Sequence, residues 1–209
     1  MIRVEVPVPI VKKKNRVATE ERMQAGIGNI LETKGHSGMT VNKVFKHLGI
    51  AKTAMYRDFE SFNNLITTYY ESIDVRLEPL LVDVSTITTE ALIDLLMNAI
   101  EKNYLFLAQS KIIREFCAWE LSDKSEMFEK QIKARDAVHL KFLEKIKPCL
   151  KDNGIKFDAV YAIIYAATNS LVLENKMFPG SHYGYNVGNE QKRNELFTTF
   201  RQLITYALS

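Results

Sequence analysis

Residues 40–59, with the sequence TVNKVFKHLGIAKTAMYRDF, constrain the fold more than any other stretch of the chain. Apolar side chains recur there at Val41, Val44, Phe45 and Leu48. This i, i+3, i+4, i+7 spacing lies on one face of a helix, and it predicts a helix over about 41–48. Gly49 follows, and glycine accepts the left-handed conformation of a sharp helix exit.

A second short helix is predicted from about Ala51 to Asp58. It buries Ala54 and Met55, with Phe59 beyond its end, and so turns its cationic and hydroxyl side chains away from the core. Two short helices joined by a glycine turn are typical of a helix-turn-helix, whose second helix enters the DNA major groove, about 12 Å wide. A helical hairpin without a DNA role has the same spacing.

A longer pattern runs through this region as Gly35…Thr40…Val44…Gly49-Ile50-Ala51-Lys52…Met55-Tyr56…Phe59…Ser61…Leu65. It resembles the signature of the TetR family of bacterial repressors over about residues 19–66. Three positions depart from the family pattern: Phe45 replaces a small residue, Ala51 a small polar residue and Phe62 a lysine. The last two weaken expected cap or phosphate contacts.

The resemblance implies an all-α chain with a three-helix DNA-binding domain at its N-terminus, here residues 16–63. Residues 64–209 are then a helical bundle that binds a ligand and forms a dimer. Residues 1–15, with prolines at 7 and 9 and lysines at 12–14, are expected to be a flexible basic arm. Such an arm can lie along DNA, or it can be a solvated charge run without a partner.

Eight residues are candidates for DNA contact by their position. We expect Thr40, which stands at the N-cap of the first short helix, Lys52, Tyr56 and Arg57 to contact phosphates. Thr53 is expected to face base edges, and Ala51 a thymine methyl. Lys43 and Lys46 are weaker phosphate candidates. Residues 1–60 carry eleven Lys and Arg against six Asp and Glu, whereas the whole chain has a net charge of only +3. The cationic excess is therefore concentrated around the predicted helix-turn-helix.

Helical periodicity continues to the C-terminus. Helices are predicted from near Thr19 to Gly35, from Ser61 to about Val75 or beyond, and over 90–107, 111–121, 122–150, 157–176 and 190–208. The last two have broad apolar surfaces, and small residues at Ala162, Ala166 and Ser170 permit close approach. We expect these helices to pair with a second copy as a homodimer; the alternative is that they form the core of a monomer.

The middle helices carry aromatic and polar side chains that should face one another. The resemblance implies a pocket for a small-molecule effector there, and simple core packing explains the same residues without one. The candidates for ligand contact are Tyr104, Phe106, Phe116, Trp119, Phe128, His139, Phe142, Tyr165 and Asn169. His139 lies on an otherwise apolar stripe, where a core histidine is the competing interpretation.

Other classes of function find no support in the sequence. The four histidines have no ligand spacing, the two cysteines lie far apart, and no acid–base pair or phosphate loop stands out. We therefore expect neither an enzyme nor a cofactor or metal. The longest uncharged run, Ala159 to Leu173, is shorter than the ~20 residues of a membrane span, and the N-terminus is not a signal peptide. The prediction is a cytoplasmic dimeric regulator that binds a double-stranded operator, most simply a repressor. The alternative is a helical sensor or interaction protein with weakened or lost DNA binding.

Overall fold

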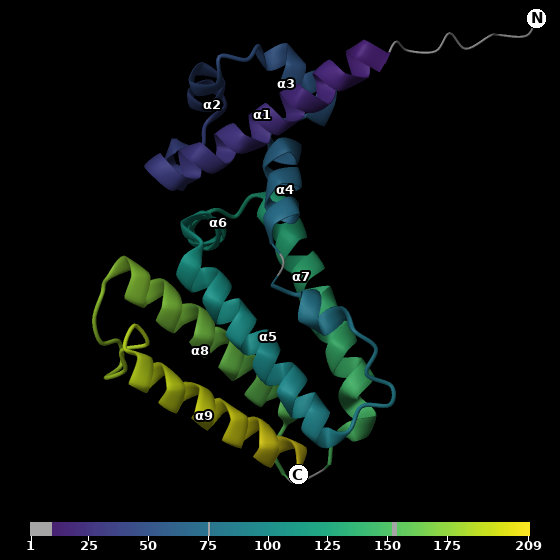
Figure 1. The fold of residues 1–209 in the computed structure, drawn as a ribbon, viewed down its shortest axis with the longest axis vertical. Helices are drawn as coiled ribbons and strands as arrows, with labels where there is room; N and C mark the ends of the chain where they lie inside the picture. Colours follow the sequence, from purple (N-terminus) through teal and green to yellow (C-terminus); the bar gives the residue numbers. More distant parts are fainter. Residues whose placement is uncertain (1–9, 75, 152–153) are drawn as a thin grey trace, which may run out of the picture. The chain divides into compact units, whose positions relative to one another are not determined.

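The computed structural model describes residues 10–74, 76–151 and 154–209, and its named elements in these ranges are all helices (Figure 1). The α-helices are α1 (Ile10–Lys34), α2 (Val41–Leu48), α3 (Lys52–Phe59), α4 (Phe62–Ile73), α5 (Thr89–Gln109), α6 (Lys111–Ser122), α7 (Glu126–Ile146), α8 (Phe157–Met177) and α9 (Glu190–Leu208). Three short 3₁₀ helices are η1 (His36–Gly38), η2 (Glu78–Leu81) and η3 (Lys147–Cys149). The predicted all-α class is confirmed.

The chain divides into two compact units. The first holds the chain up to Ile73 together with Glu115–Met127, and the second holds Asp74–Arg114 together with Phe128–Ser209. The first unit therefore extends beyond the expected boundary at residue 63. It takes in all of α4 and also most of α6, which the sequence had assigned to the bundle.

In the first unit, α1, α2, α3 and α4 pack around a common apolar core. Its fully buried side chains include Met23 and Ile27 of α1, Val44 of α2, Met55 of α3 and Leu65 of α4. Gly26 explains how closely α1 and α2 approach: a Cβ atom at this position would lie 1.8 Å from a methyl carbon of Leu48. Glycine is a poor helix former, but any larger residue at position 26 would force the Leu48 side chain of α2 to move.

Two predicted helix limits in this unit were wrong. α1 begins at Ile10 and not near Thr19, so residues 10–15, expected in the flexible arm, are helical. The sequence from Ile10 to Lys34 contains no proline, and nothing interrupts the helix before Gly35. Residues 1–9 of the predicted arm lie outside the described residues. α4 ends at Ile73, short of its predicted limit at about Val75 or beyond, and Val75 itself lies outside the described residues.

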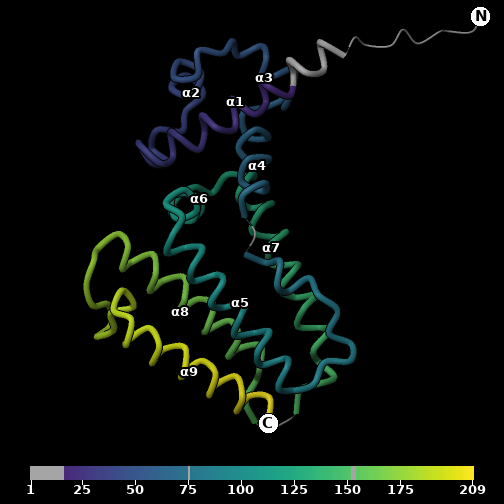
Figure 2. Tube along the Cα trace, in the orientation of Figure 1, coloured from purple at the N-terminus to yellow at the C-terminus, as the bar shows by residue number. Residues whose placement is uncertain are grey.

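In the second unit, α5, α8 and α9 lie side by side (Figure 1). The trace shows α8 and α9 running antiparallel, joined by the loop after Met177 (Figure 2). Their shared core includes Leu96 and Ile100 of α5, Ile164 of α8 and Ile204 of α9, each at most 2% exposed. Two of these helices have side-chain N-caps: Thr88 accepts a hydrogen bond from the Ala91 amide, and Asn189 accepts one from the Lys192 amide.

α7 begins at Glu126, later than the predicted start at Ser122, and ends at Ile146. Pro148 then lies in the one-turn helix η3, as a proline that ends or divides a helix should. α8 (Phe157–Met177) matches its predicted range to within one residue. Other helices of the chain bury only part of its surface. Ala159, Ala162, Ile163 and Ala166 are exposed along one side of it in the single chain.

Candidate nucleic-acid interface and effector site

The helix-turn-helix in α2 and α3 has the local geometry that the sequence predicts. Gly49 closes α2 in the left-handed conformation, with φ 61° and ψ 26°, and its amide donates to the Phe45 carbonyl over 3.1 Å. Thr40 has the extended backbone of an N-cap, with φ −119° and ψ 146°, but its hydroxyl makes no capping hydrogen bond. The hydroxyl is exposed, so it is available to an outside partner.

All eight candidate residues for DNA contact are exposed: Thr40, Lys43, Lys46, Ala51, Lys52, Thr53, Tyr56 and Arg57. On α3, a residue is buried or exposed according to the face of the helix on which it lies. Met55 of α3 is fully buried, whereas the next residue, Tyr56, leaves 55% of its surface in solvent. A large aromatic side chain held at the surface among cationic and hydroxyl groups is suited to a polar, anionic partner such as a phosphate backbone.

The two cations of α3 already have partners. Arg57 donates to both oxygens of Asp58 over 2.7 and 2.6 Å, and this pairing raises the pKa of its guanidinium. Lys52 donates to the Asn42 side chain over 2.6 Å. The pairs hold the charged ends in defined positions on the surface, since both cations remain exposed.

The two ends of α3 depart from ideal helix chemistry. Ala51 occupies the N-cap with an extended backbone, and alanine has no side-chain acceptor for the first turn. Glu60 at the C-cap has a positive φ of 64°, which is uncommon for a residue other than glycine. The loss of a cap anticipated from the sequence is therefore present in the fold.

In the second unit, a polar and aromatic cluster joins α7 to α8. His139 Nδ1 lies 2.7 Å from the Tyr161 hydroxyl, and the His139 ring meets the Tyr165 ring edge-on at 5.0 Å between centroids. Phe142 is buried and stacks on Tyr161. We call His139, Phe142, Tyr161 and Tyr165 the aromatic cluster. Three of its members are sequence candidates, and Tyr161 was missed because it falls within an apolar run.

The titratable groups of the aromatic cluster are held neutral. Burial lowers the pKa of His139, and the charge of Arg135 lowers it further. Burial raises the pKa of Tyr161 above its usual value and raises that of Tyr165 to about 12. The Tyr165 hydroxyl is buried beside Tyr161, whose hydroxyl interacts with it, and it makes no other hydrogen bond to a residue that the structure describes. A buried hydroxyl with spare hydrogen-bonding capacity gains from an added partner, so Tyr165 is the polar group of the cluster best suited to bond an incoming molecule.

The other ligand candidates lie in several surroundings. Asn169 accepts a hydrogen bond from the buried Asn103 over 2.8 Å, and this links α8 to α5. Tyr104 donates to the Val187 carbonyl over 3.0 Å and packs edge-on against Phe197 of α9. Phe106 is half-buried and Phe128 is buried. Asn103, like Tyr161, was not among the candidates.

Phe116 and Trp119 belong to the first unit. Phe116 is fully buried there, with its ring 4.4 Å from that of Tyr70 of α4, and it stacks on Trp119. The Trp119 indole donates to Asp123 over 3.1 Å. Their side chains are occupied in holding α6 to α4, a structural role that the helical spacing alone does not separate from ligand contact.

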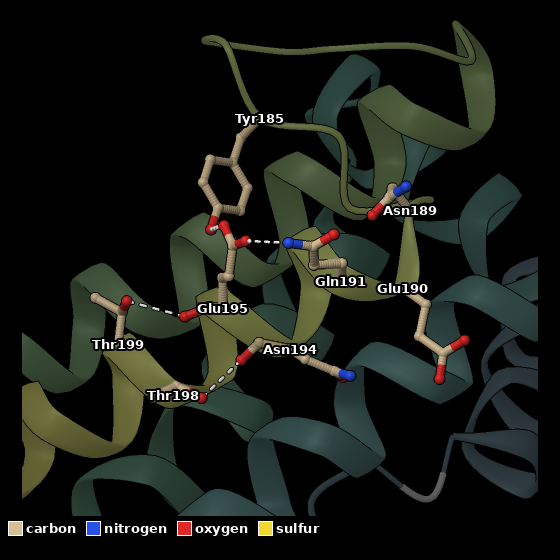
Figure 3. Close-up of a pocket in the computed structure, with 8 residues that line it drawn as sticks. All are labelled: Tyr185, Asn189, Glu190, Gln191, Asn194, Glu195, Thr198 and Thr199. Carbon is tan, nitrogen blue, oxygen red and sulfur yellow. Dashed lines mark hydrogen bonds between the residues drawn. The ribbon is translucent and has the colours of Figure 1, made fainter.

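A wide, open depression of about 960 Å³ lies over the first turns of α9 (Figure 3). Its lining is polar and comes from the loop before α9 and from one side of the helix: Tyr185, Asn189, Glu190, Gln191, Asn194, Glu195, Thr198 and Thr199. Glu195 accepts hydrogen bonds there from Gln191 and Tyr185, each over 3.2 Å (Figure 3). None of the ligand candidates lines this depression, which is too open to enclose a small molecule.

The described part of the chain contains neither a cluster of metal ligands nor a membrane-spanning helix. No group of three or more His, Cys, Asp or Glu side chains in residues 10–74, 76–151 and 154–209 is placed to hold a metal ion. No helix in the same ranges combines the length and the apolar character needed to cross a bilayer.

Comparison with known proteins gives matches at the level of structure. No protein-family model and no curated protein sequence matches the chain. NalD of Pseudomonas aeruginosa, the secondary repressor of the MexAB-OprM multidrug efflux pump, is similar at a TM-score of 0.61 and 15% identity, covering 88% of this chain and 96% of its own. GusR of Salmonella enterica is similar at 0.60 and 13% identity, covering 92% and 96% respectively.

A third similar structure is a TetR-family protein from Vibrio parahaemolyticus, described as a transcriptional regulator. Its TM-score is 0.55 at 11% identity, and the match covers 88% of this chain and 96% of that one. Each match covers nearly the whole length of the compared structure, so the similarity includes the helical bundle as well as the helix-turn-helix. The chain therefore has the all-α fold of the TetR-family regulators.

Proposed function

We propose that this protein is a dimeric, DNA-binding transcriptional regulator, a repressor that a small molecule releases from its operator. The observation that carries the proposal is the outer face of the helix-turn-helix. Lys52, Thr53, Tyr56 and Arg57 are all exposed on α3, whereas Met55 on the opposite side is buried in the core. The similar solved structures include a protein named as a repressor and another named as a TetR-family transcriptional regulator.

In this proposal α3 enters the major groove. Tyr56, Lys52 and Arg57 contact phosphates, and Thr40 supports them from the start of α2. Lys43 and Lys46 add weaker phosphate contacts. Thr53 reads base edges, with Ala51 against a thymine methyl.

The DNA contacts are tested by comparing operator with random DNA in binding titrations at several salt concentrations. Arg57→Ala should weaken binding to both DNAs and reduce the salt slope by about one phosphate contact. Thr53→Ala should change sequence preference more than overall affinity. Lys133→Ala, which removes an exposed cation from α7, is the matched control and should change neither. Lack of wild-type binding to the DNA upstream of its own gene at low salt would favour the alternative, a helical sensor without DNA binding.

The second part of the proposal is a two-fold dimer through α8 and α9. Ile163 on α8 is 63% exposed and lies among the small exposed residues Ala162 and Ala166 of the same helix, and Tyr206 on α9 is 60% exposed. An exposed apolar face of this kind is typical of an interface between copies. The polar side chains over the first turns of α9 (Figure 3) would form its hydrophilic end. Two recognition helices would then meet successive major grooves about 34 Å apart.

The dimer is tested by sedimentation of Ile163→Asp, which places a charge in the proposed interface. We expect the variant to sediment as a single subunit. Ile132→Asp on α7, where the native side chain is also exposed, should remain dimeric. A wild-type protein that sediments as a stable monomer would contradict this part of the proposal.

The effector site in the proposal is the aromatic cluster together with Asn169 and Asn103. Since burial keeps His139, Tyr161 and Tyr165 neutral, the site favours an uncharged, largely aromatic molecule with one hydrogen-bonding group directed at the Tyr165 hydroxyl. In this proposal the effector binds best to a conformation in which the two recognition helices are wrongly spaced for the operator, and so it weakens DNA binding. Bound DNA weakens effector binding by the same factor, typically about 5–150-fold.

The effector site is tested by thermal-shift titration with neutral phenols and aryl ketones. A compound that stabilises the wild type should bind Tyr165→Phe about tenfold more weakly, since the directed hydrogen bond is lost. Tyr185→Phe, which removes a hydroxyl outside the cluster, should leave its affinity unchanged. Equal binding to both variants would exclude Tyr165 from the site.

A further inference from the structure

The turn after α1 is held by a side chain from α6. Glu115 Oε2 accepts a hydrogen bond from the backbone amide of His36 over 2.9 Å, and His36 Nδ1 lies 2.9 Å from the same oxygen. Both side chains are partly shielded, with 24% and 33% of their surfaces exposed. The residues involved belong to the first unit although they are 79 positions apart in sequence. A hydrogen bond to a charged carboxylate is stronger than one between neutral groups.

Gly35 makes room for this carboxylate. Its φ is +67°, and a Cβ atom there would lie 2.7 Å from Glu115 Oε2. A side chain at residue 35 would therefore be strained by the backbone and would also push Glu115 away. The glycine that ends α1 is thus also the place where α6 docks.

Ring stacking reinforces the same contact. His36 stacks on Trp119 at 6.4 Å with an interplanar angle of 21°, and Trp119 stacks on Phe116 at 6.2 Å and 17°. Phe116 then packs on Tyr70 of α4. α6 is therefore held to the α1–η1 turn by hydrogen bonds and to α4 by aromatic contacts.

The position of the turn matters for the helix-turn-helix. It leads directly through η1 to Thr40, the N-cap of α2, so it determines where α2 begins. The residue before Glu115 has a complementary contact in the second unit: Arg114 donates to the Leu107 and Ala108 carbonyls at the end of α5, over 2.7 and 3.1 Å. Neighbouring residues of α6 therefore make their contacts in different units, Arg114 within the second and Glu115 within the first.

We infer that Glu115 is a positioning residue for DNA binding: it fixes the α1–η1 turn and so preorganises the helix-turn-helix, and it ties that motif to α6. This inference rests on the proposed DNA-binding function. If the turn is not tied, it must be ordered when DNA binds, and the ordering cost reduces affinity. The His36 imidazole acts through the same carboxylate, so its contribution depends on the presence of Glu115.

The experiment uses the full chain and measures operator affinity together with hydrogen exchange of the His36 amide. Glu115→Ala should weaken operator binding about tenfold and speed exchange at His36, and Glu115→Gln, which keeps an acceptor oxygen, should recover part of both. His36→Ala should weaken binding less, and the double variant should bind no more weakly than Glu115→Ala alone. Glu21→Ala, an exposed carboxylate of α1, is the control and should change neither reading.

Several results would overturn the inference. One is wild-type operator affinity in Glu115→Ala while His36 exchange is accelerated, and another is a double variant whose losses simply add. Unchanged exchange at His36 in Glu115→Gln and Glu115→Ala would show that the carboxylate does not hold the turn. A wild type that ignores DNA would refute the proposed function, and the exchange measurement would still decide whether Glu115 ties the turn.

Discussion

The outer face of α3 and the aromatic cluster of the second unit place their functional candidates in opposite ways. The eight DNA candidates fall within residues 40–57, and all are exposed on two short helices or at the N-caps of these helices. The cluster combines α7 with α8, and its hydroxyls and imidazole are withdrawn from water. Substitutions on the outer face of α3 should therefore affect binding without unfolding the protein. Substitutions in the cluster should affect binding and stability together.

The largest expected effect is a loss of stability on substitution of a buried residue of the aromatic cluster. Phe142 is 1% exposed and stacks on Tyr161, so Phe142→Ala leaves a cavity in the core of the second unit. We expect a loss of about 3–5 kcal/mol in the free energy of unfolding, measured by urea denaturation. Leu140→Ala, two residues away on the exposed side of α7, should change it by no more than about 0.5 kcal/mol. Similar losses in both variants would mean that α7 is not seated as described.

A smaller effect tests whether the cluster is neutral. The pKa of His139 lies below its ordinary value of 6.5 in the folded protein, because burial disfavours the charged ring. Below pH 6.5 the unfolded chain therefore binds a proton that the folded chain does not, and stability falls with decreasing pH until the folded-state pKa is passed. We expect this loss to be reduced in His139→Gln, measured by thermal unfolding from pH 7.5 to 5. An identical pH profile in the two proteins would contradict a buried neutral imidazole.

The smallest expected effects lie at the exposed turns on either side of α3. Glu60 has a positive φ of 64° and Gly49 one of 61°. Glu60→Gly should relieve strain and stabilise the first unit by up to about 1 kcal/mol, whereas Gly49→Ala should destabilise it by about 1 kcal/mol. Both are measured by chemical denaturation. Opposite signs are the expected result; destabilisation by both would show that Glu60 makes contacts worth more than its backbone strain.

The same contrast explains what could be predicted from the sequence. The limits of α2, the left-handed Gly49 and the exposed faces follow from interactions within a few residues, and periodicity and capping describe those well. The contact of Glu115 with His36 joins residues 79 positions apart, and nothing in either local sequence indicates it. Tyr161 was missed for a related reason: in an apolar run a tyrosine looks like core, and only its hydrogen bond to His139 distinguishes it.

The errors at helix ends have local causes of another kind. The start of α1 was placed at Thr19 because acidic residues follow a threonine there, a pattern typical of an N-terminus. The same residues are compatible with a helix interior, and the helix continues back to Ile10. The assignment of α6 to the bundle followed from its place in the chain, whereas the aromatic contacts of Phe116 group it with the first unit.

The uncovered side of α8 and α9, marked by Ile163 and Tyr206, has a consequence for how such a regulator would respond to its own abundance. Where pairing is needed before the operator can be held at both half-sites, scarce subunits remain single, and occupancy climbs with the square of their concentration. In the proposed repressor, a modest rise in synthesis would then repress transcription steeply, and dilution during growth would relieve repression with equal steepness.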